Sequence, residues 1–334
     1  KILDTVRIEQ VIGDFVQLKQ QGPNYTGLSP FVEEKTPSFV VSPVKQIYKD
    51  FSSGKGGSAV NFLMEKLGVT FPEAIEHLAK KYAIDIEYEN PEVAEKKKKE
   101  LDKKEKLRET LTSVYNLYRK EYGILEADHP ARFEVEQKRG YNQEDIMEWG
   151  IAYAPENFLY DKLKNSAKVN DGLALGLIKQ GNFENKYDAY TGRVIYPIHD
   201  ANGLLIGLAG RSLKEKPRSK WINPTVDQNN LLYQKSKVLF GYHKAKHEIR
   251  KRNEAFIVEG YNDVIAWHKY GCENTVAASG TSLSPAQLNM LKRICDKLIF
   301  CMDPDRAGQA AVLKFLPDCL AMGFRVEVVQ LPCD

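Results

Sequence analysis

The sequence predicts an α/β protein with a parallel, Rossmann-like sheet in its C-terminal part. Three observations predict this fold. Short apolar runs alternate with amphipathic stretches through residues 251–334. A hairpin pattern with a turn at Asn202-Gly203 occupies residues 192–211. Hydrophobic residues make up 43% of the 334-residue chain and charged residues 28%, which is typical of a globular protein.

The alternation is clearest at the C-terminal end. Apolar runs expected to form strands lie at 255–260, 275–280, 297–303 and 325–331. Helical stretches separate them at 263–271, 284–295 and 308–323. Strands that alternate with helices form a parallel sheet covered on both faces.

The chain is expected to contain four regions. Residues 1–90 form a small module, with strands at 37–43 and 45–52 and helices at 4–16, 58–68 and 71–82. Residues 91–125 form a highly charged helix that links domains. Residues 126–250 form a mixed α/β domain, and residues 251–334 carry the parallel sheet.

Composition excludes several classes of protein. No apolar run approaches the roughly 20 residues that span a bilayer, and the N-terminus lacks an apolar signal core. The five cysteines form no CxxC pair, so a disulfide framework or a cysteine zinc site is not expected. We expect a cytoplasmic protein. The net charge of +3 does not by itself indicate nucleic-acid binding.

Four acidic residues follow two of the expected strands. Glu259 ends one strand and Asp263 follows four residues later, while Asp303 ends another strand and Asp305 comes two residues on. Ligands of parallel α/β sheets lie at the carboxyl ends of the strands. Hard carboxylate oxygens suit Mg²⁺ or Mn²⁺, and two such ions about 3.5–4 Å apart can clamp a phosphoryl group.

These motifs resemble the Toprim fold of bacterial primases, topoisomerases and related nucleases. The resemblance rests on VEGYND at 258–263, ASGTSLS at 278–284 and MDPDRAG at 302–308. The wider chain resembles bacterial DnaG-type DNA primases. The matching segments include 27–57, 71–84, 192–211, KWINP at 220–224 and 231–245.

The resemblance implies a nucleotidyltransferase that synthesises short RNA primers for DNA replication. Glu259, Asp263, Asp303 and Asp305 would bind two Mg²⁺ or Mn²⁺ ions, and Glu259 could also act as an acid/base group. The partners would be single-stranded DNA template, NTPs and, in the primosome, a replicative helicase that contacts a C-terminal region absent from this chain. No membrane partner is expected.

The sequence departs from the family pattern near the acidic motifs. Pro304 stands where the family usually has glycine, which implies a stiffer loop. The family also has a further acidic motif beyond the position of Asp334, so we expect the chain to be a fragment.

Basic residues are expected to hold template and triphosphates. The resemblance places the template groove and nucleotide site at Arg139, Arg211, Lys220 and Lys235. Basic groups beside aromatic rings suit single-stranded nucleic acid. The full set of candidates is Arg139, Arg193, Arg211, Lys220, Asn223, Lys235 and Lys237.

The N-terminal module resembles the zinc ribbon of primases but lacks its ligands. The family's Cys, His, Cys and Cys positions read Ser29, Val32, Asp50 and Ser53 here. Structural zinc requires four nitrogen or sulfur ligands, so no zinc is expected. An apolar core would replace the metal, drawn from Phe31, Phe39, Val41, Ile47, Tyr48, Phe51 and Phe62. Template contacts are expected from Lys35, Lys45, Lys49 and Lys55 with Phe39, Tyr48 and Phe51.

Two other functions compete with primer synthesis. A Toprim nuclease of a mobile element or defence system would share the four acids but would not need the hairpin, KWINP or the YQKS element at 233–236. A non-catalytic single-stranded-DNA-binding protein would not need the acids. A topoisomerase is disfavoured because the chain is short and we expect no further domain in it that could carry a nucleophilic tyrosine.

Overall fold

The structure is a computed structural model that describes residues 5–67, 69, 71–84, 91–226, 229–278, 283–303 and 306–329. The chain divides into two compact units, Lys1–Glu95 and Lys96–Asp334. No helix within the described ranges is long and apolar enough to cross a membrane.

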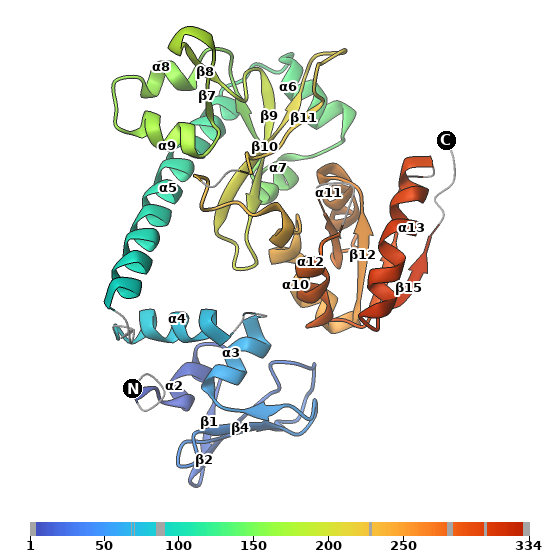
Figure 1. Ribbon diagram of the computed structural model, residues 1–334. Helices are drawn as coiled ribbons and strands as arrows, with labels where there is room; N and C mark the ends of the chain where they lie inside the picture. Colours follow the sequence, from blue (N-terminus) through green and yellow to red (C-terminus); the bar gives the residue numbers. More distant parts are fainter. Residues whose placement is uncertain are drawn as a thin grey trace. The chain divides into compact units, whose positions relative to one another are not determined.

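The first unit is built on a five-stranded antiparallel sheet (Figure 1). Its strands, in both chain and spatial order, are β1 (Lys19–Gln21), β2 (Asn24–Gly27), β3 (Phe39–Ser42), β4 (Ile47–Asp50) and β5 (Gly56–Gly57). Its helices are α2 (Ile8–Gly13), α3 (Ala59–Leu67) and α4 (Phe71–Lys81). The β3–β4 hairpin was expected from the sequence, whereas the β1–β2 hairpin was not.

Aromatic rings form the centre of this unit. Phe39 stacks on Tyr48 with ring centroids 5.3 Å apart, and Phe62 meets Tyr48 edge-on at 5.5 Å. All three side chains are buried. The sequence also placed Ile47 and Phe51 in this core, and that was wrong: both are exposed, Phe51 by 69%.

A long helix, α5 (Pro91–Gly123), contains the boundary between the units, and its residues from Lys96 onward belong to the second unit. Residues 95–103 of α5 are exposed, as the charged sequence predicted. Further along the helix, Leu107, Leu111, Val114 and Tyr118 are buried in the main core of the second unit. The apolar positions near the end of the helix therefore fix it to the domain that follows.

An antiparallel sheet of order β11-β10-β9-β6 follows α5 in the chain. The strands are β6 (Ala152–Ala154), β9 (Arg193–His199), β10 (Leu205–Ser212) and β11 (Trp221–Ile222). The β9–β10 hairpin confirms the pattern around Asn202-Gly203, and it pairs Arg211 with Val194. A small sheet of β7 (Ile178–Gln180) and β8 (Lys186–Asp188) accompanies it. The short helices of this region are α6 (Pro130–Arg132), η1 (Phe133–Lys138), α7 (Gln143–Trp149), α8 (Leu159–Leu163), α9 (Lys168–Ala174), η2 (Asn182–Glu184) and η3 (Lys235–Lys237).

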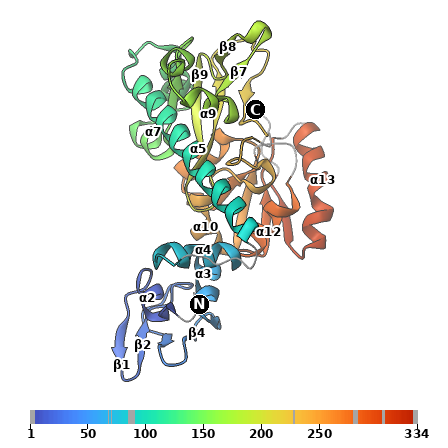
Figure 2. The same ribbon diagram turned by 60° about the vertical axis from the view of Figure 1, so that its left-hand side comes forward.

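The C-terminal sheet is parallel, with strand order β13-β12-β14-β15, as the alternating pattern predicted. Its strands are β12 (Glu254–Val258), β13 (Thr275–Ala277), β14 (Lys297–Phe300) and β15 (Arg325–Val328). Its helices are α10 (Tyr242–Arg252), α11 (Tyr261–Lys269), α12 (Pro285–Lys292) and α13 (Arg306–Ala321) (Figures 1 and 2). Because β12 and β14 are direct neighbours, their carboxyl ends lie side by side.

We expect Phe39→Ala to destabilise the first unit by about 3–5 kcal/mol, since the ring is fully buried. Urea unfolding followed by far-ultraviolet circular dichroism should show an early transition for this variant. All three tryptophans, Trp149, Trp221 and Trp267, lie in the second unit, so their fluorescence transition should not move.

Phe51→Ala is the matched control, because its ring is 69% exposed and should cost no more than about 0.5 kcal/mol. Equal costs for the two substitutions would show that the aromatic core is not where the structure places it.

Candidate active site

A cavity of about 390 Å³ lies between the antiparallel and the parallel sheet of the second unit. It is lined by Arg139, Arg211, Lys220, Trp221, Asn223, Glu259, Gly260, Tyr261, Asn262, Asp263 and Asp303. Acidic groups come from the ends of β12 and β14 and the start of α11. Basic groups come from the part of the second unit that contains the antiparallel sheet, called the antiparallel half below. The cavity therefore places carboxylates opposite cations.

Three of the four predicted acids meet in this cavity. The backbone N–H of Asp303 donates to Glu259 Oε1 at 3.1 Å, which joins the ends of the two neighbouring strands. The N–H of Gly260 donates to Asp263 Oδ2 at 2.8 Å. Burial raises the pKa of Asp263, the Gly260 N–H offsets part of that shift, and the nearby Asp303 carboxylate adds to it. The expectations for Asp305 and Pro304 fall outside the described residues.

Gly308 explains how α13 approaches this cluster. A Cβ atom at this position would lie 2.3 Å from the carbonyl oxygen of Asp303 and 2.8 Å from Glu259 Oε1. Only glycine fits so close to both the backbone of Asp303 and the side chain of Glu259. Gly308 belongs to the MDPDRAG motif at 302–308, but the sequence pattern alone indicates no role for it.

The donor set fits a hard divalent cation. Glu259, Asp263 and Asp303 all offer carboxylate oxygens to one cavity. Among the described residues, no three His, Cys, Asp or Glu side chains form a ready-made metal cage. Mg²⁺ is commonly held by one or two carboxylates together with substrate phosphates rather than by an all-protein cage. The arrangement therefore suits an ion that binds together with a phosphate ligand.

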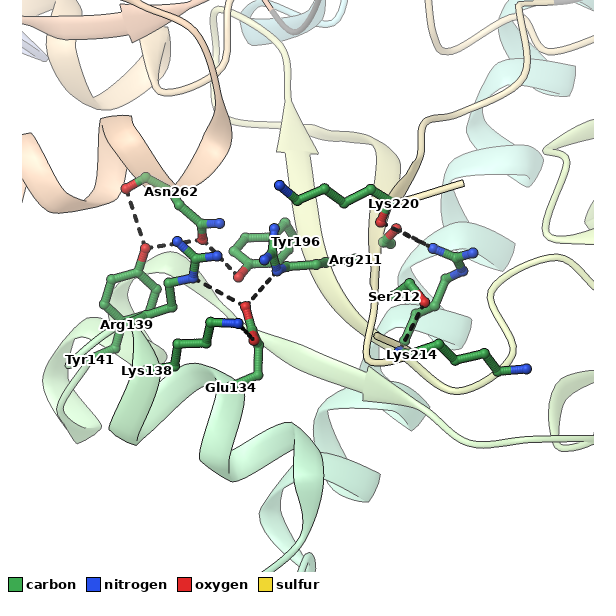
Figure 3. A network of polar contacts seen from close by, with 12 residues as sticks. Glu134, Lys138, Arg139, Tyr141, Tyr196, Arg211, Ser212, Lys214, Lys220 and Asn262 are labelled. Carbon is green, nitrogen blue, oxygen red and sulfur yellow. Dashed lines mark hydrogen bonds and ion pairs between the residues drawn. The ribbon is translucent and has the colours of Figure 1, made fainter. Parts of the chain in front are cut away.

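The basic side of the cavity is organised by Glu134, which the sequence analysis missed (Figure 3). Its Oε1 accepts a hydrogen bond from Arg139 Nε at 3.1 Å and another from Arg211 Nε at 2.5 Å. Burial alone would raise the pKa of Glu134, but Arg211 and then Arg139 hold it below its ordinary value. No local pattern could have shown this contact, because Glu134 and Arg211 are 77 residues apart in the chain.

The first turn of α11 is held by two tyrosines from the antiparallel half. Tyr196 donates to Asn262 Oδ1 at 2.9 Å, and Tyr141 donates to the same oxygen at 3.1 Å (Figure 3). Burial raises the pKa of both tyrosines, so their hydroxyls remain donors. Asn262 directly precedes Asp263, so this contact fixes the helix start that carries an acid.

Not every predicted basic residue reaches the cavity. Arg193 donates to the carbonyl oxygens of Gly210 and Ser219, each at 3.1 Å, and so supports the backbone next to Lys220. Lys235 and Lys237 are exposed on η3 and do not line the cavity. Tyr233 is 2% exposed, so its ring is part of the core and is no aromatic face for Lys235.

In the first unit, three of the four positions that match the family's zinc ligands, Ser29, Asp50 and Ser53, form a hydrogen-bonded cluster around Asp50. The Asp50 side chain is completely buried. Its Oδ2 accepts from Ser29 Oγ at 2.7 Å and from Ser53 Oγ, and its Oδ1 accepts from Ser52 Oγ at 2.8 Å. Burial opposes ionisation of Asp50, but hydrogen bonds from Ser53, Ser29 and Ser52 hold its pKa below the ordinary value.

Val32 does not take part in the Asp50 cluster through its side chain, which is 45% exposed. Only its backbone N–H joins, by donating to Ser29 Oγ at 3.1 Å. A second carboxylate, Glu34, accepts from Ser38 Oγ at 2.6 Å and from the Ser29 N–H at 2.7 Å. The set offers no sulfur or imidazole, so it does not fit structural zinc.

The expected template contacts of this unit need a correction. Phe39 and Tyr48 are buried and cannot stack on a base. A groove of about 400 Å³ lies instead on the other face of β3 and β4. It is lined by Pro23, Asn24, Val40, Ser42, Val44, Lys45, Ile47, Lys49 and Phe51.

Comparison with known proteins matches each part of the chain. Residues 1–94 match the family described as CHC2 zinc finger, residues 126–246 the N-terminal domain of the DNA primase catalytic core, and residues 254–331 the Toprim domain. The DNA primase of Halalkalibacterium halodurans is 36% identical over 99% of this chain and 55% of its own length.

Two solved structures are similar in fold. The crystal structure of the Aquifex aeolicus primase, comprising zinc-binding and RNA polymerase domains, is 30% identical with a TM-score of 0.61, over 99% of this chain and 78% of that one. A DnaG primase catalytic domain bound to single-stranded DNA is 26% identical with a TM-score of 0.61, over 70% of this chain and 75% of that one.

The three family matches define a class in which a zinc-finger-type module, a primase core and a Toprim sheet follow one another along one chain. The chain belongs to the bacterial DnaG-type DNA primases. It spans about half the length of the curated relatives it matches, 55% in the Halalkalibacterium halodurans primase.

We expect the two tyrosine contacts to Asn262 to be energetically coupled. Tyr141→Phe or Tyr196→Phe alone should cost about 1 kcal/mol, because the other hydroxyl still satisfies Asn262 Oδ1. The double variant should cost more than the sum by at least about 0.5 kcal/mol. Urea unfolding followed by tryptophan fluorescence measures all three values.

Tyr115→Phe provides the control, because Tyr115 donates at 2.6 Å to Gly150 and not to Asn262. Its cost should add to that of Tyr196→Phe. Additive costs for Tyr141→Phe and Tyr196→Phe would contradict the shared contact.

Proposed function

We propose that this chain carries the RNA-polymerising activity of a DNA primase and synthesises short RNA primers on single-stranded DNA. The observation that carries the proposal is the cavity in which Glu259, Asp263 and Asp303 face Arg139, Arg211 and Lys220. A nucleotidyl transfer needs a cation site for the reacting phosphate and cationic side chains for the rest of the triphosphate. The cavity offers both.

The reaction would join the 3′-hydroxyl of one ribonucleotide to the α-phosphate of an incoming NTP and release pyrophosphate. Glu259, Asp263 and Asp303, with Asp305, would hold two Mg²⁺ or Mn²⁺ ions. When bound, these ions would neutralise charge on the reacting phosphate and lower the pKa of the attacking hydroxyl. Arg139, Arg211 and Lys220 would bind the triphosphate. Guanidinium groups suit this role because their planar donors match phosphate oxygens.

Single-stranded DNA is the proposed template, as in the related catalytic domain that was solved with single-stranded DNA. We assign the regions as a template-binding module (1–90), a charged linker (91–125), a basic subdomain (126–250) and a Toprim catalytic subdomain (251–334). Lys235, Lys237 and the groove beside Phe51 are the proposed template contacts outside the cavity. Exposed aromatic rings next to lysines suit unpaired bases and phosphates. A contact with a replicative helicase stays a prediction.

A Toprim nuclease would use the same acids. It would give no role to the paired arginines opposite them, and the family membership favours the primase. A non-catalytic DNA-binding protein would not need an acidic cluster closed against Gly308.

We expect Glu259→Gln, Asp263→Asn, Asp303→Asn and Asp305→Ala each to reduce primer synthesis at least about 100-fold, because each removes part of the cation site, whose charge stabilisation amounts to several kcal/mol. Binding of single-stranded DNA, measured by fluorescence anisotropy, should change by less than about twofold. Short RNA products made from NTPs with Mg²⁺ or Mn²⁺ on single-stranded DNA provide the readout.

Asp296→Asn is the matched control. Asp296 precedes the opposite, amino-terminal end of β14, where it pairs with Lys292. Normal primer synthesis by the Asp303→Asn variant would overturn the proposed catalytic site.

We also propose that residues 1–90 fold without zinc. The Asp50 cluster supports this proposal, since the serine hydroxyls already donate hydrogen bonds to the Asp50 carboxylate and Val32 has no side-chain atom that could bind a metal. The aromatic core around Phe39 would supply most of the folding free energy, through apolar burial at about 25 cal/mol per Å².

Chelation should therefore leave the melting temperature of the chain unchanged, and elemental analysis should find far less than one zinc per chain. Acid should destabilise the first unit instead. Because the folded-state pKa of Asp50 is depressed, its contribution is present above the unfolded pKa and is lost as pH falls through the folded pKa. Asp50→Asn should flatten this pH dependence, measured as melting temperature from pH 7 down to pH 3.

A gain-of-function variant checks the assignment of positions. The combined substitution Ser29→Cys, Val32→His, Asp50→Cys and Ser53→Cys restores four zinc-binding side chains and should bind one zinc per chain. Stoichiometric zinc in the unmodified chain would contradict the proposal.

A further inference from the structure

Glu134 lies on an unusual turn of the backbone. Residues Phe133–Lys138 form a π-helix that directly follows the short helix α6. In an α-helix, residues four apart share a face, whereas the wider π-helical turn brings residues five apart together. Arg139 lies five residues after Glu134, and their side chains meet at 3.1 Å. Lys138, four residues after Glu134, is only within 3.6 Å of the other carboxylate oxygen, and 58% of its side chain is exposed.

The π-helical turn therefore gives Glu134 one arginine from its own segment, and β10 gives it a second. Arg211 is nearly buried, with 9% of its side chain exposed, and it lies over the Trp221 ring at 5.5 Å. Two guanidinium groups this close to one carboxylate would repel each other without it. Glu134 is thus the charge that allows both cations to occupy the same wall of the cavity.

The two arginines use only part of their hydrogen-bonding capacity in their contacts with Glu134. In the described part of the chain, each donates through Nε alone. In each guanidinium group, the two terminal nitrogens together carry four further N–H donors. Arg139 and Arg211 both line the cavity that also contains Glu259 and Asp303.

We propose that Glu134 is a positioning residue for the incoming nucleotide: it holds Arg139 and Arg211 by their Nε atoms so that their terminal nitrogens bind the triphosphate together. This inference rests on the proposed function. It differs from a purely electrostatic role, in which a carboxylate beside two arginines weakens their attraction for phosphate. Positioning predicts weaker nucleotide binding when Glu134 loses its charge, whereas an electrostatic brake predicts tighter binding.

The test uses Glu134→Gln, which keeps the shape of the side chain and removes the charge. The KM for NTP in primer synthesis should rise about tenfold (about 1.4 kcal/mol), while kcat changes by less than about threefold. Glu134→Asp, which keeps the charge but shortens the side chain, should recover part of the loss. Glu136→Gln is the matched control from the same π-helical turn, because Glu136 contacts Tyr122 and Arg132 rather than the cavity.

A mutant cycle distinguishes positioning from a general loss of structure. In a chain that already carries Arg139→Ala and Arg211→Ala, the further change Glu134→Gln should leave KM unaltered, because no arginine remains to be positioned. An added effect in that background, or an unchanged or lower KM in the Glu134→Gln single variant, would overturn the inference.

Calorimetric binding of ATP with Mg²⁺ separates this inference from the proposed function. Weaker ATP binding by Glu134→Gln in a chain that makes no RNA would support the positioning role and contradict primer synthesis. If the unmodified chain makes primers and Glu134→Gln binds ATP as tightly as the unmodified chain, the proposed function would be supported and the positioning role contradicted. A chain that binds no ATP at all would overturn both.

Discussion

The parallel pairing of β12 with β14 is the constraint on which the candidate active site depends. The pair sets Ile257 beside Phe300, so the two strands end together. Glu259 and Asp303 then emerge at the same edge, and the Asp303 N–H bonds to the Glu259 carboxylate. Carboxylates brought this close would repel one another, and the buried β12–β14 pair holds them there. Gly308 completes the arrangement, since any side chain there would push α13 away from both residues.

The antiparallel half of the second unit forms the basic wall of the cavity, and specific contacts hold this wall as well. The Glu134 carboxylate joins Arg139 to Arg211. Tyr141 and Tyr196 join the same half to Asn262 at the start of α11. The Glu134–Arg211 contact spans 77 residues of sequence, and the contacts of Tyr141 and Tyr196 with Asn262 span 121 and 66 residues. The acidic and basic walls are therefore held in register by hydrogen bonds whose direction is specific, and not by apolar packing alone.

Sequence reasoning succeeded where the signal is periodic and failed where it depends on contacts between distant segments. The four C-terminal strands and the β9–β10 hairpin follow from local patterns, and the strand ends located three acids at one edge. Glu134 gave no such signal, because a glutamate in a charged segment is usually solvated and its π-helical turn has no simple pattern. In β4 and at the residue that follows it, hydrophobicity suggested Ile47 and Phe51 for the core. The strand alternates instead with Tyr48 and Asp50 inside and Ile47 and Lys49 outside.

That alternation shows what Asp50 does for the first unit. Side chains of a strand alternate between its two faces. Shifting β4 by one residue would therefore bury Ile47 and Lys49 and expose Tyr48 and Asp50. The observed register is stabilised by three serine hydroxyls, those of Ser29, Ser52 and Ser53, which donate to the Asp50 carboxylate. A zinc ribbon gathers anionic ligands around a cation, whereas this unit gathers neutral donors around an anion. If the unit folds without zinc as proposed, its polar centre responds to the proton concentration rather than to the metal concentration, because protonation of Asp50 removes the charge that the hydroxyls surround.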